Sequence, residues 1–194
     1  MKARTTTLTL CLSLVLLPPL AEADSSSSGK GTSSARQQTD TAAFDKAMGP
    51  VFSHYEGIQK ALAADSTKGV ARAAQKIAKI AAKLKPEGVT GKHAAHYKHL
   101  PTKIKTAAKD LAKASDLAAQ RKAFMALSRP LAMWATMSKP PGINVVFCSM
   151  AKGSWLQRDK SIANPYYGSK MLRCGEVVSG RHKGTAGGHM KHGH

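Results

Sequence analysis

The sequence FDKAMGPVFSHYEGIQKAL occupies residues 44–62, and its large apolar side chains recur at steps of three and four. This spacing follows the 3.6-residue turn of an α-helix and gives the helix one continuous apolar stripe. Asp40 or Thr41 is suited to cap the first turn. The stripe consists of Phe44, Met48, Val51, Phe52, Tyr55, Ile58 and Leu62. We therefore predict a helix that buries this stripe against other elements.

Two further amphipathic segments follow the first. The second begins after Asp65 or Ser66, either of which is suited to cap it, and ends before Pro86. The third spans about 91–114 and contains Pro101. Because proline cannot donate to the helical hydrogen-bond ladder, Pro101 must bend this helix or start a new one.

A fourth amphipathic segment opens at Ser115 or Asp116 and contains Pro130, which predicts a kink. The four segments are rich in alanine and joined by short connections, and small side chains allow helices to approach closely. This pattern predicts a mainly α protein, an antiparallel four-helix bundle.

The pattern changes after the fourth segment. Residues 143–147 are β-branched and aromatic, which is typical of a short strand, and 151–154 form a turn that leads into 155–157. Asn164 and Gly168 mark a second turn. We expect a small C-terminal β-hairpin and an irregular loop subdomain packed on the bundle.

The first 23 residues indicate the compartment. Lys2 and Arg4 precede an apolar run at 8–17, and an Ala-x-Ala site ends at Ala23. This order predicts a secretory signal peptide at 1–23 and a periplasmic protein. The run is shorter than the roughly 20 residues that span a bilayer. No later stretch qualifies, so the mature chain is expected to have no transmembrane segment.

Composition divides the rest of the chain into three parts. Residues 24–40 are rich in Ser, Gly and Thr and predict a disordered linker, and 41–178 are expected to form the domain. Residues 179–194 predict a disordered Gly/His-rich tail. The metal-binding side chains of this tail are His182, His189, Met190, His192 and His194. A mobile tail of this kind either collects copper loosely or only solubilises the chain.

The net charge of +19 favours acidic proteins, anionic membranes or other polyanions as partners. Export and the scarcity of aromatic residues argue against nucleic acid. A solvated, lysine-rich helix surface with no partner is the plainer interpretation. No nucleophile elbow, P-loop, dinucleotide fingerprint or paired carboxylate site is present, so we do not expect an enzyme.

Four sulfur atoms stand out near the C-terminal end of the domain: Cys148, Met150, Met171 and Cys174. Thiolates and thioethers are soft ligands that suit Cu(I) and similar ions. If the chain is extended at Cys148, then Met150 points to the same side as Cys148. If the second pair lies on a helical turn, Met171 and Cys174 share a face. The two pairs together offer one ion up to four soft donors.

Other interpretations of these residues remain open. Two cysteines in an exported domain commonly form a structural disulfide, which closes a loop here and stabilises by roughly 3–4 kcal/mol on the chain-entropy model. The methionines, including Met133 and Met137 at i and i+4, also suit core packing. His93, His96 and His99 recur at steps of three, so neighbouring pairs suit either a metal or a solvated face.

Several motifs resemble a known family. They are Cys148-Ser149-Met150-Ala151, Trp155-Leu156-Gln157, the segment NPYYGSKMLRCG at 164–175, and the helical stretch from Tyr55 to Asp65. Over about 42–178 the chain is similar to a small domain of unknown function. That domain occurs alone or fused to periplasmic adaptor subunits of Cus-type copper/silver efflux systems. The family usually has proline between its Cys and Met, where this chain has Ser149.

The resemblance implies a stand-alone protein that handles metal. We expect an exported protein that binds Cu(I) or Ag(I) through Cys148, Met150, Met171 and Cys174. It would pass the ion to a periplasmic efflux adaptor or another metal-handling partner. Tyr166, Tyr167 and Trp155 would form apolar walls, with Asn164-Pro165 and Gly168 shaping the loop. The alternative is a disulfide-stapled basic module that docks an acidic protein or an anionic membrane surface.

Overall fold

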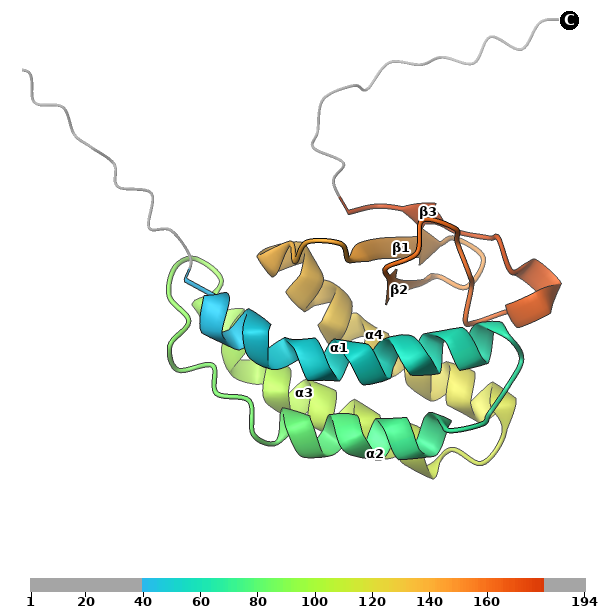
Figure 1. Ribbon diagram of the computed structural model, residues 1–194, viewed down its shortest axis with the longest axis horizontal. Helices are drawn as coiled ribbons and strands as arrows, with labels where there is room; N and C mark the ends of the chain where they lie inside the picture. The colour runs from blue at the N-terminus through green and yellow to red at the C-terminus, as the bar shows by residue number, and fades with distance from the viewer. Residues whose placement is uncertain (1–39, 180–194) are drawn as a thin grey trace, which may run out of the picture. The chain divides into compact units, whose positions relative to one another are not determined.

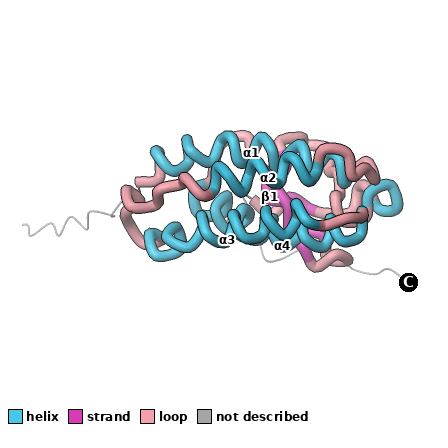
Figure 2. Tube along the Cα trace, turned by 90° about the horizontal axis from the view of Figure 1, so that it is seen from below, coloured by secondary structure: helices cyan, strands magenta, loops and turns pink. Residues whose placement is uncertain are grey.

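A computed structural model describes residues 40–179, and its core is built from four helices. Their bounds are α1 Ala42–Ala63, α2 Val70–Ala81, α3 Ala94–Lys113 and α4 Leu117–Ser138. Consecutive helices pack side by side and run in opposite directions (Figures 1 and 2). The prediction of a mainly α, antiparallel helical bundle is therefore confirmed. The predicted signal peptide and the tail histidines lie outside the described residues.

A small antiparallel sheet follows the helices. Its strands are β1 Asn144–Cys148, β2 Gly153–Gln157 and β3 Glu176–Val177, in the order β2-β1-β3. The predicted hairpin is confirmed, with Val146 opposite Trp155 in its register. Strand β3 was not predicted, because two residues are too short for a recognisable pattern. The sheet packs on α1 and α4, on the side of α1 away from α2 (Figure 1).

The chain ends of the domain are tied to neighbouring elements. Ser179, which the sequence assigns to the tail, accepts a hydrogen bond from the Val145 amide through its hydroxyl at 2.9 Å. At the other end, the Asp40 amide donates to the hydroxyl of Thr90 at 3.4 Å. Within residues 40–179, no helix has both the length and the apolar character needed to cross a bilayer.

The apolar stripe of α1 is buried along its whole length. Every member of the predicted set is at most 2% exposed and belongs to the hydrophobic core: Phe44, Met48, Val51, Phe52, Tyr55, Ile58 and Leu62. Trp134 of α4 and Trp155 of β2 are the largest side chains in the same core. The sheet and the bundle therefore share one core, and the site described below is built on it.

Tyr55 joins the helices to the sheet through its hydroxyl group. The Leu156 amide of edge strand β2 donates to Tyr55 Oη at 3.1 Å. Because the Ser128 hydroxyl donates to the Phe124 carbonyl at 2.9 Å, the 2.8 Å bond between Tyr55 and Ser128 has the tyrosine as donor. Burial raises the pKa of Tyr55 well above its ordinary value, so the proton stays in place.

Asp45 connects the opposite end of α1 to α4. One of its carboxylate oxygens accepts from Trp134 Nε1 at 2.7 Å and from the Ser138 hydroxyl at 2.6 Å. The other accepts from Thr41 at 2.6 Å. Since Ser138 donates to Asp45, its short contact with the Tyr97 hydroxyl has the tyrosine as donor. Three helices are therefore linked through one carboxylate.

The start of α2 differs from the expectation. Helix α2 begins after Gly69, which adopts a left-handed conformation (φ +80°) at the N-cap, so the prediction that Asp65 or Ser66 caps it is wrong. Helix α2 ends at Ala81, before Pro86 as expected, and Leu84 lies in a following turn.

The other two helices show how proline and caps act here. Helix α3 continues through Pro101 as one helix, so the proline does not start a new one. At the start of α4, Asp116 accepts a hydrogen bond from the Ala119 amide at 2.9 Å, which confirms the predicted N-cap.

Replacing Tyr55 with phenylalanine tests the junction. We expect Tyr55→Phe to lower the free energy of unfolding by about 1–3 kcal/mol, because the Leu156 amide and Ser128 each lose a buried partner. Urea unfolding followed by circular dichroism measures the change. The control is Tyr167→Phe, since the Tyr167 hydroxyl forms an exposed bond to the Met150 carbonyl at 3.2 Å. Equal stabilities for the two variants would contradict the assigned role.

Candidate functional site

Cys148 and Cys174 meet at the end of the sheet nearest η1. Cys148 is the last residue of β1 and is fully buried, whereas Cys174 is half-buried after the short 3-10 helix η1, Gly168–Met171. Their Sγ atoms are 2.8 Å apart and both thiols are free. A disulfide bond is about 2.05 Å long. The fold therefore brings the two thiol groups into direct contact.

The sheet register explains this contact. Phe147 pairs with Glu176 across β1 and β3, so the residues just before β3 run back beside Cys148. Gly175 makes the approach possible. It has φ +148°, and a Cβ added there would lie 2.6 Å from the Trp155 ring. Any larger residue at 175 would push Cys174 away from the sheet.

Hydrogen-bond donors surround the sulfur of Cys148. Burial alone would raise its pKa, but several donors outweigh burial and hold the pKa below its ordinary value. They are the Cys174 thiol, the backbone amides of Ala151 and Met150, and the Asn164 side chain. The Ala151 amide lies 3.5 Å from the sulfur. Cys148 is thus the more acidic thiol of the pair.

Cys174 has the complementary role. Donation of its proton to Cys148 raises its pKa, and burial and the charge of Cys148 act in the same direction. Because Cys174 donates its proton toward the Cys148 sulfur, the two thiols lose their protons in two steps that belong to the pair. A thiolate with an adjacent thiol is suited to bind a soft cation or to be oxidised.

Both methionines lie between the two cysteines in the sequence, each two or three residues from its nearer cysteine. Strand β1 ends at Cys148 and a turn follows, so the chain is not extended through Met150 and the condition that would direct Met150 and Cys148 to one side is not met. The Met150 side chain is 61% exposed. Met171 ends η1 and is half-buried, and its carbonyl accepts from the Cys174 amide at 3.0 Å. This bond forms the predicted turn between Met171 and Cys174.

Aromatic side chains lie behind the pair, as the sequence indicated. Trp155 and Tyr166 are buried and meet edge to face, with ring centroids 5.7 Å apart. The Tyr166 hydroxyl donates to the Ser154 carbonyl at 2.5 Å. Burial raises the pKa of Tyr166, and the charge of Cys148 acts in the same direction. Tyr167 is half-buried, and its hydroxyl donates to the Met150 carbonyl.

Asn164 organises the loop that carries Cys174. The residue is fully buried, and its side-chain oxygen accepts from the amides of Tyr166 at 2.8 Å and Tyr167 at 3.3 Å. Its side-chain amide donates to the Cys174 carbonyl at 2.8 Å. The shape that the sequence attributed to Asn164-Pro165 therefore comes from the asparagine side chain, which contacts both the loop and the cysteine.

A second anchor, missed in the sequence, joins Arg121 of α4 to Asp65. Arg121 Nη2 lies 2.5 Å from the Asp65 carboxylate and 2.8 Å from the Leu62 carbonyl, and Nε donates to the Pro165 carbonyl at 3.0 Å. The other Asp65 oxygen accepts from the Ser169 amide at 3.0 Å. These hydrogen bonds hold the pKa of Asp65 well below its ordinary value. No local pattern reveals the pair, because its partners are 56 residues apart.

Gly168 is required where this anchor meets η1. It adopts φ +58°, and a Cβ added there would lie 2.0 Å from an Asp65 oxygen and 2.2 Å from Arg121 Nη2. The turn predicted at Gly168 therefore exists because only glycine leaves room for the ion pair.

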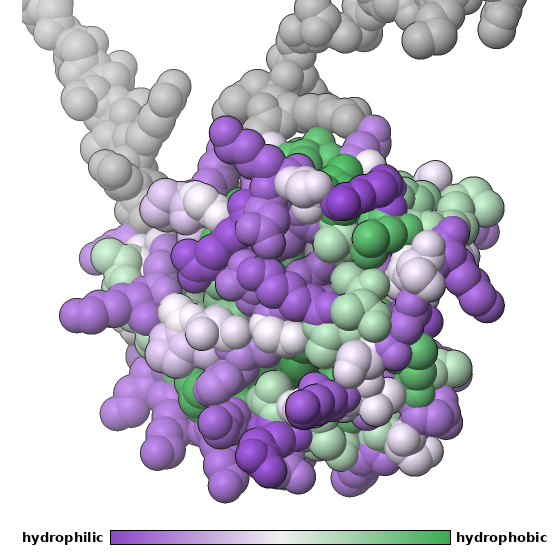
Figure 3. Space-filling model, turned by 45° about the vertical axis from the view of Figure 1, so that its right-hand side comes forward, coloured by the Kyte–Doolittle hydropathy of each residue, from purple (hydrophilic) through white to green (hydrophobic). Residues whose placement is uncertain are grey.

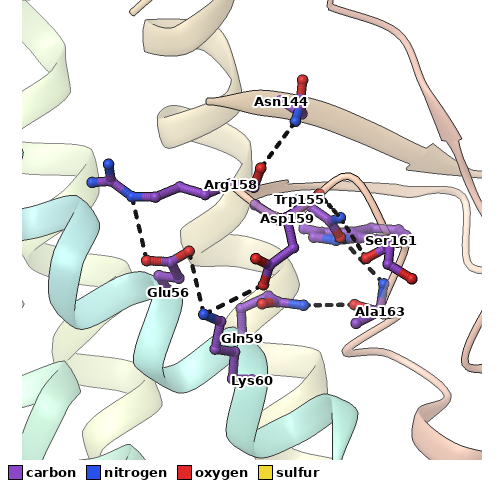
Figure 4. Close-up of polar contacts among 10 residues, drawn as sticks. Glu56, Gln59, Lys60, Asn144, Trp155, Arg158, Asp159, Ser161 and Ala163 are labelled. Atoms are coloured by element: carbon purple, nitrogen blue, oxygen red, sulfur yellow. Dashed lines mark hydrogen bonds and ion pairs between the residues drawn. The ribbon is translucent and has the colours of Figure 1, made fainter. Parts of the chain in front are cut away.

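The loop after β2 is fastened to α1 by polar contacts (Figure 4). Gln59 donates to the Ala163 carbonyl at 2.6 Å. Glu56 forms ion pairs with Lys60 at 3.6 Å and Arg158 at 3.4 Å, and Lys60 also lies 3.4 Å from Asp159. Because this loop leads directly into Asn164, the contacts fix the start of the cysteine-bearing segment.

The weaker candidates from the sequence lie elsewhere. Met133 and Met137 of α4 pack against the hydrophobic core. Met133 also lines a cavity of about 530 Å³ between α3 and α4. The rings of His93 and His96 have centroids 6.2 Å apart, and His99 is exposed. Among residues 40–179, no three or more His, Cys, Asp or Glu side chains group in a way that would hold a metal.

Residues 40–179 thus form a mainly α domain whose small sheet carries a pair of free cysteines. Residues 51–140 match a family described as a protein of unknown function (DUF3347). The match supports the predicted small domain of unknown function, but it ends just after α4 and does not reach Cys148. No curated protein and no solved structure matches the chain. The link to copper/silver efflux adaptors stays a prediction.

Acid unfolding tests the Arg121–Asp65 anchor. Because the folded pKa of Asp65 lies below its unfolded value of about 3.9, its stabilisation is present above that pH and is lost as pH falls. We expect Asp65→Asn to be less stable than the wild type near neutrality, with the difference shrinking in acid. Thermal unfolding across pH measures it. Asp110→Asn, an exposed carboxylate on α3, is the control, and a difference independent of pH would contradict the prediction.

A matched pair of variants tests the donor role of Cys174. A serine at 174 keeps a donor for the Cys148 sulfur, whereas an alanine removes it. We expect the pKa of Cys148 to be lower in Cys174→Ser than in Cys174→Ala. The ultraviolet absorbance of the thiolate against pH measures this, after subtraction of a variant that also carries Cys148→Ser. Identical pKa values in the two variants would contradict the assignment.

Proposed function

We propose that the chain is an exported protein that binds Cu(I) or Ag(I) and passes the ion to an efflux or resistance partner. The contact between Cys148 and Cys174 carries this proposal, because it places two soft donors within reach of one ion. Met150 and Met171 supply the further thioether ligands. Each lies two or three residues from one of the cysteines, and the exposed Met150 is suited to meet an incoming ion.

The environment of Cys148 supports metal binding at neutral pH. Metal ligands must be deprotonated, so a cysteine whose pKa is already low competes better with protons. The buried rings of Trp155 and Tyr166 exclude water on the core side of the pair. On the other side, half-buried Cys174 and exposed Met150 leave a path by which the ion enters and leaves.

Binding an ion between the two sulfurs requires a small rearrangement. With metal–thiolate bonds of about 2.3 Å, two thiolates in a tetrahedral site lie roughly 1 Å farther apart than the 2.8 Å seen here. The segment of Cys174 is the one that moves, since Cys148 belongs to a paired strand inside the core.

Anaerobic titration of the reduced protein with Cu(I), against a competing chelator, tests the proposal. We expect one tightly bound ion. Substitution of residues that only support metal ligands commonly lowers affinity by up to roughly 100-fold. The variant Cys148→Ser/Cys174→Ser should lose more affinity than that. Met150→Leu and Met171→Leu should weaken binding less, and Met133→Leu, in the helical core, should leave it unchanged.

The same double variant separates the cysteines from the rest of the chain. Any Cu(I) that it still binds measures the contribution of other sites, including the predicted histidine-bearing tail. An affinity equal to that of the wild type would remove the cysteines as ligands. A protein isolated from the exported fraction with no free thiol would favour the disulfide-stapled module instead, since oxidation consumes both thiolates.

A further inference from the structure

Helix α2 presents cations that the rest of the fold does not use. The ion pairs of the domain described above join α1, α4, the connection after α1 and the loop after β2. None of these pairs involves α2, and α2 itself contains no acidic residue. The positive charges of α2 therefore face solvent, and no carboxylate of the same helix neutralises them.

Five cations on α2 and at its two ends form one stripe. They follow one another at steps of four, four, three and four, and all are exposed: Lys68, Arg72, Lys76, Lys79 and Lys83. The opposite side of the helix is buried through Val70, Ala74, Ile77, Ala78 and Ala81. At 1.5 Å per residue, the part of the stripe inside the helix, from Arg72 to Lys79, is about 10 Å long. In Figure 3 hydrophilic side chains project along the lower edge, where Figure 1 places α2.

Helix α3 packs beside α2 and extends the same charge. From residue 66 to residue 113 the chain contains 12 Lys or Arg residues and only two acidic residues, Glu87 and Asp110. Among the lysines of α3, Lys98, Lys103, Lys109 and Lys113 are exposed. The two helices together therefore carry a strongly positive charge.

The composition of this segment indicates which anion it fits. Arg72 is its only arginine, so the forked groups that bind a fixed phosphate or carboxylate are nearly absent. Flexible lysines suit a plane of mobile anionic headgroups. Tyr97 is the only Phe, Tyr or Trp residue of the segment, and it is buried and cannot stack on nucleic-acid bases. Protein interfaces usually have an apolar core, and the exposed large hydrophobic side chain of the domain, Met150, is outside this segment.

We propose that the exposed stripe of α2, supported by the lysines of α3, docks the protein on an anionic lipid bilayer. The contact is electrostatic and leaves the helices outside the hydrocarbon. Figure 1 places α2 on the side of α1 opposite the sheet. A docked protein therefore presents Cys148 and Cys174 away from the lipid, where another protein can reach them.

Vesicle binding by the full exported chain tests this proposal. The probes are vesicles of phosphatidylcholine alone and of equimolar phosphatidylcholine and phosphatidylglycerol, with bound protein measured by co-sedimentation. We expect binding to the anionic vesicles only, and binding should weaken as ionic strength rises through about 0.15 M. No binding to anionic vesicles, or equal binding to both kinds, would overturn the proposal.

Two variants with the same net charge distinguish a docking face from general attraction. The first changes four cations of the stripe: Arg72→Gln, Lys76→Gln, Lys79→Gln and Lys83→Gln. The control changes four exposed lysines outside α2 and α3: Lys139→Gln, Lys152→Gln, Lys160→Gln and Lys170→Gln. The first variant should bind roughly a hundredfold more weakly than the wild type. The control should bind within roughly fivefold of the wild type, which is the change in affinity expected from the loss of a single lysine contact with the membrane.

Equal weakening of the two variants would show that net charge alone drives binding and would overturn the proposal. Binding to polyglutamate or DNA without binding to anionic vesicles would assign the face to an acidic macromolecule and would also overturn it. Circular dichroism shows that both variants are folded. The outcome is independent of the metal site, because neither variant changes a cysteine or methionine.

Discussion

The Tyr55 hydroxyl is the interaction on which the arrangement of sheet and helices depends. It accepts from the Leu156 amide of the edge strand β2 and donates to Ser128 of α4. An edge strand leaves backbone donors without a partner, and a buried donor without a partner is costly. The Tyr55 hydroxyl of α1 accepts the hydrogen bond of the Leu156 amide. The position of the sheet on the bundle is therefore set by a polar contact inside an apolar core.

The position of Cys174 depends on this placement through several further contacts. Asn164 holds its carbonyl, Gly175 lets the chain lie against Trp155, and Arg121 binds the loop carbonyl at Pro165. Cys148 needs none of these contacts, because it belongs to a strand paired on the hairpin side. The short distance between the sulfurs is thus a property of the loop as much as of the sheet.

The helices and their buried stripe were predictable because burial repeats with the period of the helix. The stripe from Phe44 to Leu62 is completely buried, and Asp116 caps α4 as expected. The hairpin was also recognisable from its β-branched residues. By contrast, Asp65 was misassigned as a helix cap, because its real partners, Arg121 and the Ser169 amide, are distant in sequence. Local patterns contain no information on such pairs.

The cysteine site also combines features that the sequence predicts with features that depend on residues distant in sequence. The sequence singled out Cys148 and Cys174 by chemistry, but their contact follows from the pairing of β1 with β3, a strand too short to predict. The alternation of side chains along a strand does not apply to Met150, because the strand ends two residues earlier. No sequence pattern indicated the hydrogen-bond donors that make Cys148 the more acidic thiol.

The asymmetry between the two cysteines limits how the site is able to change. Cys148 is buried in a paired strand, with the amide of Ala151 near its sulfur. Cys174 is half-buried and follows an irregular loop, beside a glycine. Insertion of an ion widens the gap between the sulfurs, and formation of a disulfide narrows it. Both changes distort the core less when Cys174 moves than when Cys148 moves. The loop from Asn164 to Gly175 therefore controls whether the two sulfurs separate around an ion or approach to form a disulfide.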